Sequence, residues 1–156
     1  MRATKAIFPV FAAGDRLRVA VTGALVEGIE AELAALAAKL AKAKAVELDC
    51  AKVTVLNSTG IRHWASFLDA LAAVVPFEIT GCVPAYLDYC TLLPHKLHAH
   101  RIRSALVTLV CTECGERTEK TLTRAALDRC DWDPREICPA CQGGQAPEPA
   151  LAPLKG

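Results

Sequence analysis

The chain has 156 residues, and its 18 Lys and Arg against 17 Asp and Glu give a formal net charge of +1. This balance leaves no basic stripe for nucleic acid and no acidic tail. The apolar share of 53% is enough for one core plus a small appendage, but no apolar run is long enough to span a bilayer, so we expect no membrane partner.

The first predicted elements form a hairpin. Residues 6–11 (AIFPVF) suit a short edge strand, because Pro9 cannot donate to a central ladder. Gly14-Asp15 marks a turn, and the alternation over 17–21 predicts a second strand that ends at Gly23.

Helices and strands then alternate along the chain. Leu33, Leu36 and Leu40 share one face of a predicted helix, and the near-continuous apolar run of the next segment suits a strand buried on both faces. The predicted elements are a helix over 29–44, a strand over 46–56, a helix over 60–75, a strand over 77–80, a helix over 84–93 and a strand over 102–110. This order predicts an α/β fold with parallel strands and helical crossovers.

The strand over 46–56 runs directly into Asn57-Ser58-Thr59-Gly60, where the next helix begins. The free N–H groups of a helix N-terminus favour negative charge, so the turn could hold an anion or a phosphorylated hydroxyl. In a purely structural interpretation, Ser58 or Thr59 only caps the helix, which contributes about 1 kcal/mol to stability.

The runs Leu48-Asp49-Cys50 and Asn57-Ser58-Thr59-Gly60-Ile61, with the element order, resemble a STAS domain, the fold of bacterial anti-sigma-factor antagonists and of sulfate-transporter cytoplasmic domains. The resemblance covers about residues 5–110 and implies a STAS-like mixed sheet flanked by helices, in a domain of residues 1–110. It also implies that a kinase, itself the anti-sigma factor, phosphorylates Ser58, with Thr59 beside it. Two positions differ from the family pattern: Asn57 replaces an acid, and Glu27 is displaced from the acidic position after Gly23.

In this family the start and outer face of that helix contact the partner. The resemblance therefore predicts the partner-binding residues Asn57, Ser58, Thr59, Arg62, His63, Ser66 and Asp69. Trp64 is in phase with Ile61 and Leu68, so we expect it in the core.

Two C-x2-C pairs lie near the C-terminus, Cys111 with Cys114 and Cys138 with Cys141, separated by residues 115–137. This spacing is typical of a zinc ribbon, in which four thiolates close a tetrahedral structural Zn2+ site. Iron in a rubredoxin-like site uses the same ligands, and paired cysteines also occur in thiol-redox motifs and in disulfides. We predict a ribbon over 111–145 and a flexible Pro/Ala-rich tail over 146–156.

The remaining Cys and His residues suggest structural roles. We expect Cys130 to be a buried thiol, Cys50, Cys82 and Cys90 to be small core residues, and His95, His98 and His100 to lie in an exposed loop. Metal thiolates indicate a reducing compartment, so we expect a cytoplasmic protein despite a weakly signal-like N-terminus.

No catalytic constellation stands out. The sequence predicts a non-enzymatic regulatory or scaffold protein that binds an anti-sigma-factor-like or kinase-like protein, or another regulatory complex. Two further hypotheses are a zinc-ribbon nucleic-acid-binding or transcription-associated protein, which the balanced charge of the ribbon disfavours, and a thiol-redox enzyme.

Overall fold

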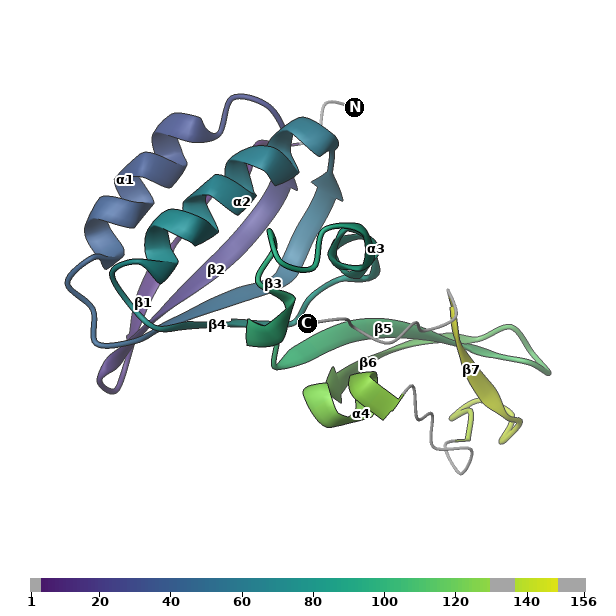
Figure 1. Ribbon diagram of the computed structural model, residues 1–156. Helices are drawn as coiled ribbons and strands as arrows, with labels where there is room; N and C mark the ends of the chain where they lie inside the picture. The colour runs from purple at the N-terminus through teal and green to yellow at the C-terminus, as the bar shows by residue number, and fades with distance from the viewer. Residues whose placement is uncertain (1–3, 130–136, 149–156) are drawn as a thin grey trace.

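The computed structural model describes residues 4–129 and 137–148, which form two sheets. The first sheet has the strand order β1-β2-β3-β4, and helices α1 and α2 run side by side across one of its faces (Figure 1). The elements of this part are β1 (Val10–Ala13), β2 (Arg16–Leu25), α1 (Glu30–Leu40), β3 (Val46–Leu56), α2 (Ser58–Ala72), β4 (Phe77–Thr80), α3 (Pro84–Leu92) and the 3-10 helix η1 (Ala99–Arg101).

The predicted mixed α/β sheet flanked by helices is confirmed. β1 pairs antiparallel with β2 as the predicted hairpin, whereas β2, β3 and β4 pair in parallel. The bounds of β3 and β4 are those predicted. The first strand differs, because the segment before Pro9 contributes only single bridges from Lys5 and Ile7 to β2, and the regular strand starts at Val10.

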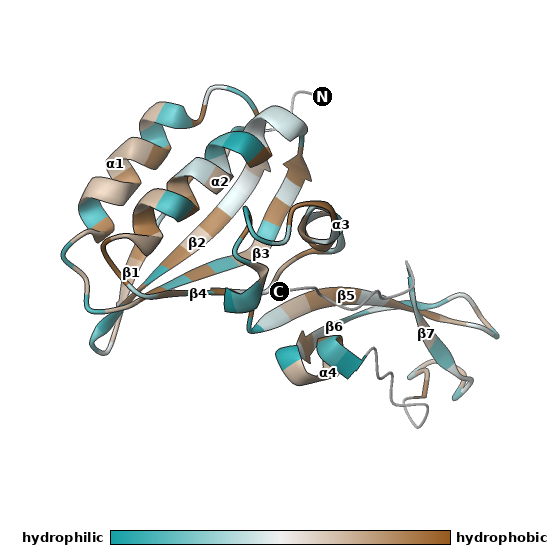
Figure 2. Ribbon diagram, viewed as in Figure 1, coloured by the Kyte–Doolittle hydropathy of each residue, from teal (hydrophilic) through white to brown (hydrophobic). Residues whose placement is uncertain are grey.

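The second sheet has the order β6-β5-β7, and α4 follows β6. Its elements are β5 (Ser104–Cys111), β6 (Arg117–Thr123), α4 (Arg124–Arg129) and β7 (Gln145–Glu148). Figure 2 shows hydrophobic colours along β2, β3 and β5 but mainly hydrophilic colours on β7.

The order of elements predicts β5 as the last strand of the first sheet, and the structure shows it pairing with β6 and β7 instead. Its bonds to the first sheet are confined to its start: the Arg103 N–H, just before β5, donates to the Ile79 carbonyl of β4 at 2.8 Å, and the Leu106 N–H donates to the Cys82 carbonyl, just after β4, at 2.8 Å. β4 is four residues long and ends at Thr80, before the left-handed Gly81, so it offers the rest of β5 no partner. Residues 146–148, predicted as part of a flexible tail, form the end of β7.

Trp64 lies at the centre of the core and is fully buried, as predicted. Its Nε1 donates to the Tyr86 hydroxyl at 2.9 Å, and its ring packs against Phe8 and Phe67. Cys50, Cys82 and Cys90 are also fully buried, which confirms the prediction for them, and burial raises the pKa of the Cys90 thiol to about 12. These thiols are therefore neutral packing groups.

Candidate functional site

Asn57 caps the N-terminus of α2. Its Oδ1 accepts from the Gly60 N–H at 2.8 Å, and its Nδ2 donates to Glu27 Oε2 at 2.7 Å. The hypothesis that Ser58 or Thr59 caps the helix is therefore wrong, because the Asn57 side chain already bonds the free backbone donor. The hydrogen bond from Asn57 lowers the pKa of Glu27, so this carboxylate, which looks displaced in the sequence, stands beside the motif as an anion.

Gly60 allows α2 to start directly against the end of β2. A Cβ at Gly60 would lie 2.0 Å from the Leu25 carbonyl oxygen and 2.5 Å from the Val26 nitrogen. The Asn57 N–H also donates to the Leu25 carbonyl at 3.2 Å. The close backbone approach at Gly60 thus fixes the position of the Ser-Thr pair.

Ser58 is exposed at the first position of α2, and Thr59 is half-buried at the second. Neither hydroxyl makes a hydrogen bond to another residue in the described part of the chain. Ser58 is thus the more accessible hydroxyl, at a helix end where negative charge is favoured.

A groove of 380 Å³ runs along α2 from Ser58, and we call it the α2 groove. One wall is α2, and the other is the segment between α3 and η1. Its lining is Ser58, Ile61, Arg62, Ala65, Ser66, Asp69, Leu93 and Lys96. Four predicted partner-binding residues line it, whereas Leu93 and Lys96 were not predicted because nothing in their local sequence indicates that they lie beside α2.

The remaining predicted partner-binding residues lie away from the groove. Asn57 and Thr59 sit at the helix start without lining it, and His63 faces α1, where its Nε2 lies 2.9 Å from Glu30 Oε1.

His98 connects the far end of the α2 groove to the core. Its Nε2 lies 2.8 Å from Asp69 Oδ1, and its ring packs edge-on against Phe77. The prediction that the three histidines lie in an exposed loop is wrong for His98, whose side chain is only 14% exposed; His95 and His100 are exposed. The contact fixes Asp69 at the rim of the groove.

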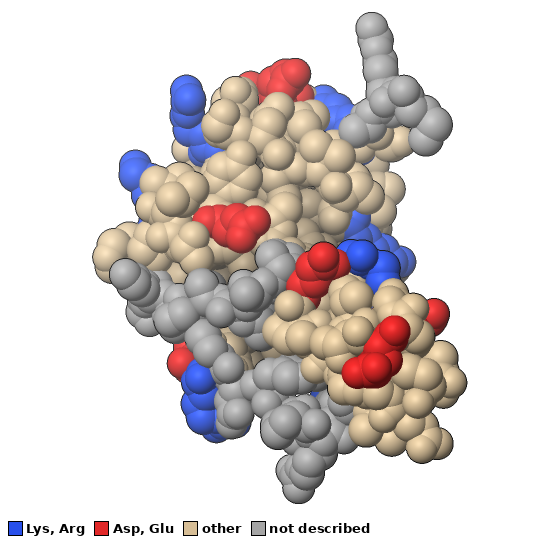
Figure 3. Space-filling model, turned by 90° about the vertical axis from the view of Figure 1, so that its right-hand side faces the viewer, with Lys and Arg blue, Asp and Glu red and all other residues tan. Residues whose placement is uncertain are grey.

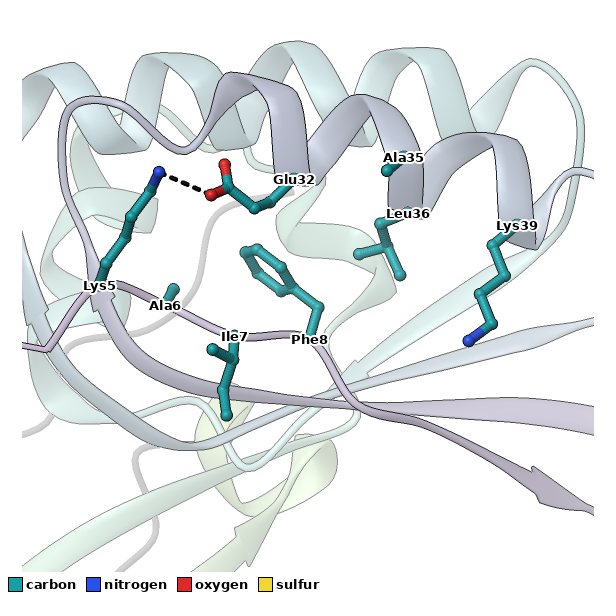
Figure 4. A pocket seen from close by; sticks show the side chains of 8 residues that line it. All are labelled: Lys5, Ala6, Ile7, Phe8, Glu32, Ala35, Leu36 and Lys39. Carbon is teal, nitrogen blue, oxygen red and sulfur yellow. Dashed lines mark ion pairs between the residues drawn. The ribbon is translucent and has the colours of Figure 1, made fainter.

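A second groove, of 390 Å³, lies between the N-terminal segment and α1 (Figure 4). Lys5 Nζ pairs with Glu32 Oε1 at 2.6 Å at one end, and Lys39 lies at the other. Phe8 and Leu36 form an apolar floor that belongs to the core. The groove is a dip over packed side chains, and its lining contains no acid–base or nucleophilic set.

The four cysteines of the C-x2-C pairs converge, with their Sγ atoms within 4.8 Å of one another. Cys111 Sγ lies 3.5 Å from Cys141 Sγ, and Cys114 Sγ lies 3.7 Å from Cys138 Sγ. A tetrahedral zinc with Zn–S bonds of about 2.3 Å needs sulfurs about 3.8 Å apart. The thiol set therefore fits a metal ion of this kind.

The two C-x2-C turns have the same backbone hydrogen bonds. In the first, the Gly115 N–H donates to the Cys111 carbonyl and the Cys111 N–H donates to the Glu116 carbonyl. In the second, the Gln142 N–H donates to the Cys138 carbonyl and the Cys138 N–H donates to the Gly143 carbonyl. The residue after each second cysteine has a left-handed backbone, with φ of 76° at Gly115 and 65° at Gln142.

Backbone N–H groups also point at the sulfurs. The N–H groups of Cys114 and Glu113 lie 3.5 and 3.4 Å from Cys111 Sγ and lower its pKa to about 7, against an opposing effect of burial. Similar donors at 3.4 Å reach Cys138 from Ala140 and Cys141 from Gly143. Such donors stabilise thiolates, which are the form that binds metal.

Cys130, which we predicted to be a buried thiol, lies outside the described residues. Four thiolates fill a tetrahedral site, so the metal would have no open position for substrate.

Among the described residues, no helix has the length and apolar character required to cross a bilayer.

Comparison with solved structures finds an anti-sigma factor antagonist from Mycobacterium paratuberculosis, the kind of protein that the motif resembles. Its TM-score is 0.48 at 20% identity, over 58% of this chain and 79% of that chain. A variant of RsbS from Moorella thermoacetica has a TM-score of 0.45 at 19% identity, over 61% of this chain and 84% of that chain. No protein-family model and no curated protein matches the sequence. At these levels of similarity, neither structure assigns a function or a residue role to this chain.

Proposed function

We propose that this chain is a non-enzymatic regulatory protein of the cytoplasm that binds a protein partner through the α2 groove. Ser58 is its phosphorylation switch, and a structural Zn2+ held by Cys111, Cys114, Cys138 and Cys141 forms the ribbon. The single observation that carries the proposal is the α2 groove, which joins an exposed serine at a helix start to an apolar floor with a charged rim.

The charges of the groove explain how phosphorylation would switch partners. The charged residues of the lining are Arg62, Lys96 and Asp69, so it has one more cationic than anionic side chain. A phosphate on Ser58 adds nearly two negative charges and is favoured by the helix N-terminus. It reverses the sign of the rim, so the unmodified and modified forms suit different partners.

An anti-sigma-factor-like kinase is the proposed partner class, which the resemblance of residues 48–61 to STAS domains supports. Nothing in the described ribbon favours nucleic acid. Arg117 pairs with Glu148 at 2.7 Å, and Arg124 pairs with Asp128 at 2.7 Å. On the face shown in Figure 3, Lys and Arg, like Asp and Glu, lie in small separate groups, and neither sign forms a continuous patch.

The test is partner capture from cells of the organism that encodes the chain, with two matched variants. Ser66→Arg places a long cation in the α2 groove, and Ala38→Arg makes a similar change at an exposed position of α1. We expect Ser66→Arg to lose the captured protein and Ala38→Arg to retain it. Equal capture by both variants would overturn the docking surface.

Phosphorylation is tested separately by mass spectrometry of the protein purified from those cells. We expect phosphate on Ser58, its loss in Ser58→Ala and its retention in Thr59→Ala. Phosphate found only on other residues would reject Ser58 as the switch without affecting the groove.

A further inference from the structure

A third cavity, of 420 Å³, lies at the opposite end of the first sheet from Ser58. It opens at the amino ends of the parallel strands, where Leu17, Val46 and Phe77 stand in register across β2, β3 and β4. Its charged and titratable lining residues are Arg16, Glu78, His100, Arg101 and Arg103. None of these residues takes part in the α2 groove or the cysteine site.

The positive charges of this cavity exceed the negative charges. Among the described lining residues, Glu78 is the one carboxylate, and it forms ion pairs with two arginines. Its Oε1 lies 3.1 Å from Arg103 Nε, and its Oε2 lies 3.6 Å from Arg16 Nη1. Arg101 has no carboxylate within ion-pair distance in the described part of the chain. Three guanidiniums against one carboxylate leave an excess of two positive charges.

Arg101 is held in place by contacts that leave donors unused. Its guanidinium carbon lies 4.4 Å from the centroid of the Phe77 ring, and its Nη1 donates to the Phe77 carbonyl at 3.3 Å. Its Nε is buried without a hydrogen-bond partner in the described structure. A rigid arginine stacked on an aromatic ring is well suited to recognise an oxyanion.

The positive charges around the cavity also act on His100. The pKa of His100 is lowered, first by burial and then by the positive charges of Arg101, His98, Arg124 and Arg103. Arg18, on the same side of the sheet, already pairs with Asp49 and Glu47 and takes no part. An added anion would thus meet Arg101, which has no carboxylate partner in the described part of the chain, and two arginines that share the single carboxylate of Glu78.

We propose that this cavity binds a phosphate group, either inorganic phosphate or the phosphate of a mononucleotide. Arg16, Arg101 and Arg103 surround one space, and guanidiniums bind phosphate oxygens through paired N–H donors. The cavity volume exceeds that of a free phosphate, and the floor provided by Val46, Pro76 and Phe77 is apolar. The cavity therefore has room for a phosphate ester as well as the free ion.

The probes are inorganic phosphate and AMP, titrated separately into the full-length, metal-loaded chain at constant ionic strength. Backbone amide NMR shifts report the site, and we expect saturable shifts at Arg16, Phe77 and Arg103. A stronger response to AMP identifies an ester as the ligand source, and a stronger response to phosphate identifies the free ion. Shifts that chloride reproduces at the same ionic strength, or no saturable shift with either probe, would overturn the proposal.

Two variants change the affinity in opposite directions. Arg16 and Arg103 have side chains 43% and 52% exposed, so replacing them does not disturb the core. We expect Arg16→Gln/Arg103→Gln to weaken binding roughly thirtyfold and Glu78→Gln to tighten it about fivefold, from about 1 kcal/mol per charge at contact distance. Arg117→Gln, on the second sheet, is the control and leaves the affinity unchanged. Equal affinity in all variants contradicts the site, whereas Ser66→Arg tests only the α2 groove.

Discussion

The part of the chain up to Cys111 and the part after it are stabilised by different interactions. The first part buries a continuous apolar core around Trp64, Leu48 and Ile79. Among the described residues after Cys111, the buried ones are Leu122, Leu127, Cys138 and Gln145. An apolar core too small to fold alone requires a crosslink or a metal. Leu122 and Leu127 belong to the same apolar cluster as the first part, so the region in which we expect the fold to depend on the thiols is that of the two C-x2-C turns and β7.

The largest expected effect is the loss of the metal. Cys138→Ser, or chelation, should unfold the C-x2-C turns and β7 while β2, β3 and α2 remain folded, because structural zinc supplies about 10–16 kcal/mol in small zinc domains. Zinc content and hydrogen exchange measured by mass spectrometry give the result: one zinc per native chain, and lost protection at 137–148 but not at 46–72.

Cys90→Ala is the matched control, because Cys90 is a buried thiol of the first part. It should leave one zinc per chain. A Cys138→Ser variant that kept one tightly bound zinc, or a chelated chain with β7 still protected, would remove the proposed dependence on metal.

The next largest effect is expected at Gly60. Gly60→Ala places a Cβ 2.0 Å from the Leu25 carbonyl oxygen, so α2 must move away from β2. We expect the free energy of unfolding of the first part to fall by about 3 kcal/mol or more, with zinc content unchanged. Chemical denaturation followed by tryptophan fluorescence in a Trp132→Phe background, where Trp64 is the remaining tryptophan, measures it. Ser66→Ala, on the exposed side of α2, should change it by less than about 0.5 kcal/mol, and a similarly small change for Gly60→Ala would show that the contact is not needed.

A smaller effect is expected from the one hydrogen bond that Trp64 makes inside the core. Tyr86→Phe removes the acceptor of the Trp64 indole N–H, which then remains buried and unpaired. This should lower the free energy of unfolding by about 1–3 kcal/mol. Tyr89→Phe changes a half-buried tyrosine of the same helix and should cost less. Equal losses in the two variants would indicate that packing, rather than the hydrogen bond, determines the cost.

Local patterns predicted most of the first part. The apolar run of β3 and the strand before Gly81 have the predicted bounds, because burial on a sheet imposes a strong local constraint. Which strands pair with one another could not be predicted from local patterns. β5 has the composition of a central strand, but β4 is too short to pair along it, and the convergence of the four cysteines accompanies the pairing of β7 with β5.

In the candidate sites, too, some features follow from the local sequence and others depend on the tertiary fold. The spacing of the four cysteines predicted their convergence, because a C-x2-C turn has few conformations. The cap at Asn57 was missed because Ser and Thr are also common caps, and choosing among them requires the Gly60 N–H direction. Leu93 and Lys96 reach the α2 groove only through the tertiary fold, and Glu27 reaches Asn57 at the start of α2 in the same way.

The smallest expected effects separate the two C-x2-C turns, which share their hydrogen bonds but differ at the left-handed residue. Gly115 adopts φ of 76° without strain, whereas Gln142 holds φ of 65° with a side chain. Gly115→Ala should therefore weaken zinc binding about fivefold, from a cost of about 1 kcal/mol. Gln142→Gly should strengthen it by a smaller factor, because relief of strain is offset by a more flexible unfolded chain. Competition titration with a chromogenic chelator measures both, and changes of the same sign would show that the two turns are not equivalent.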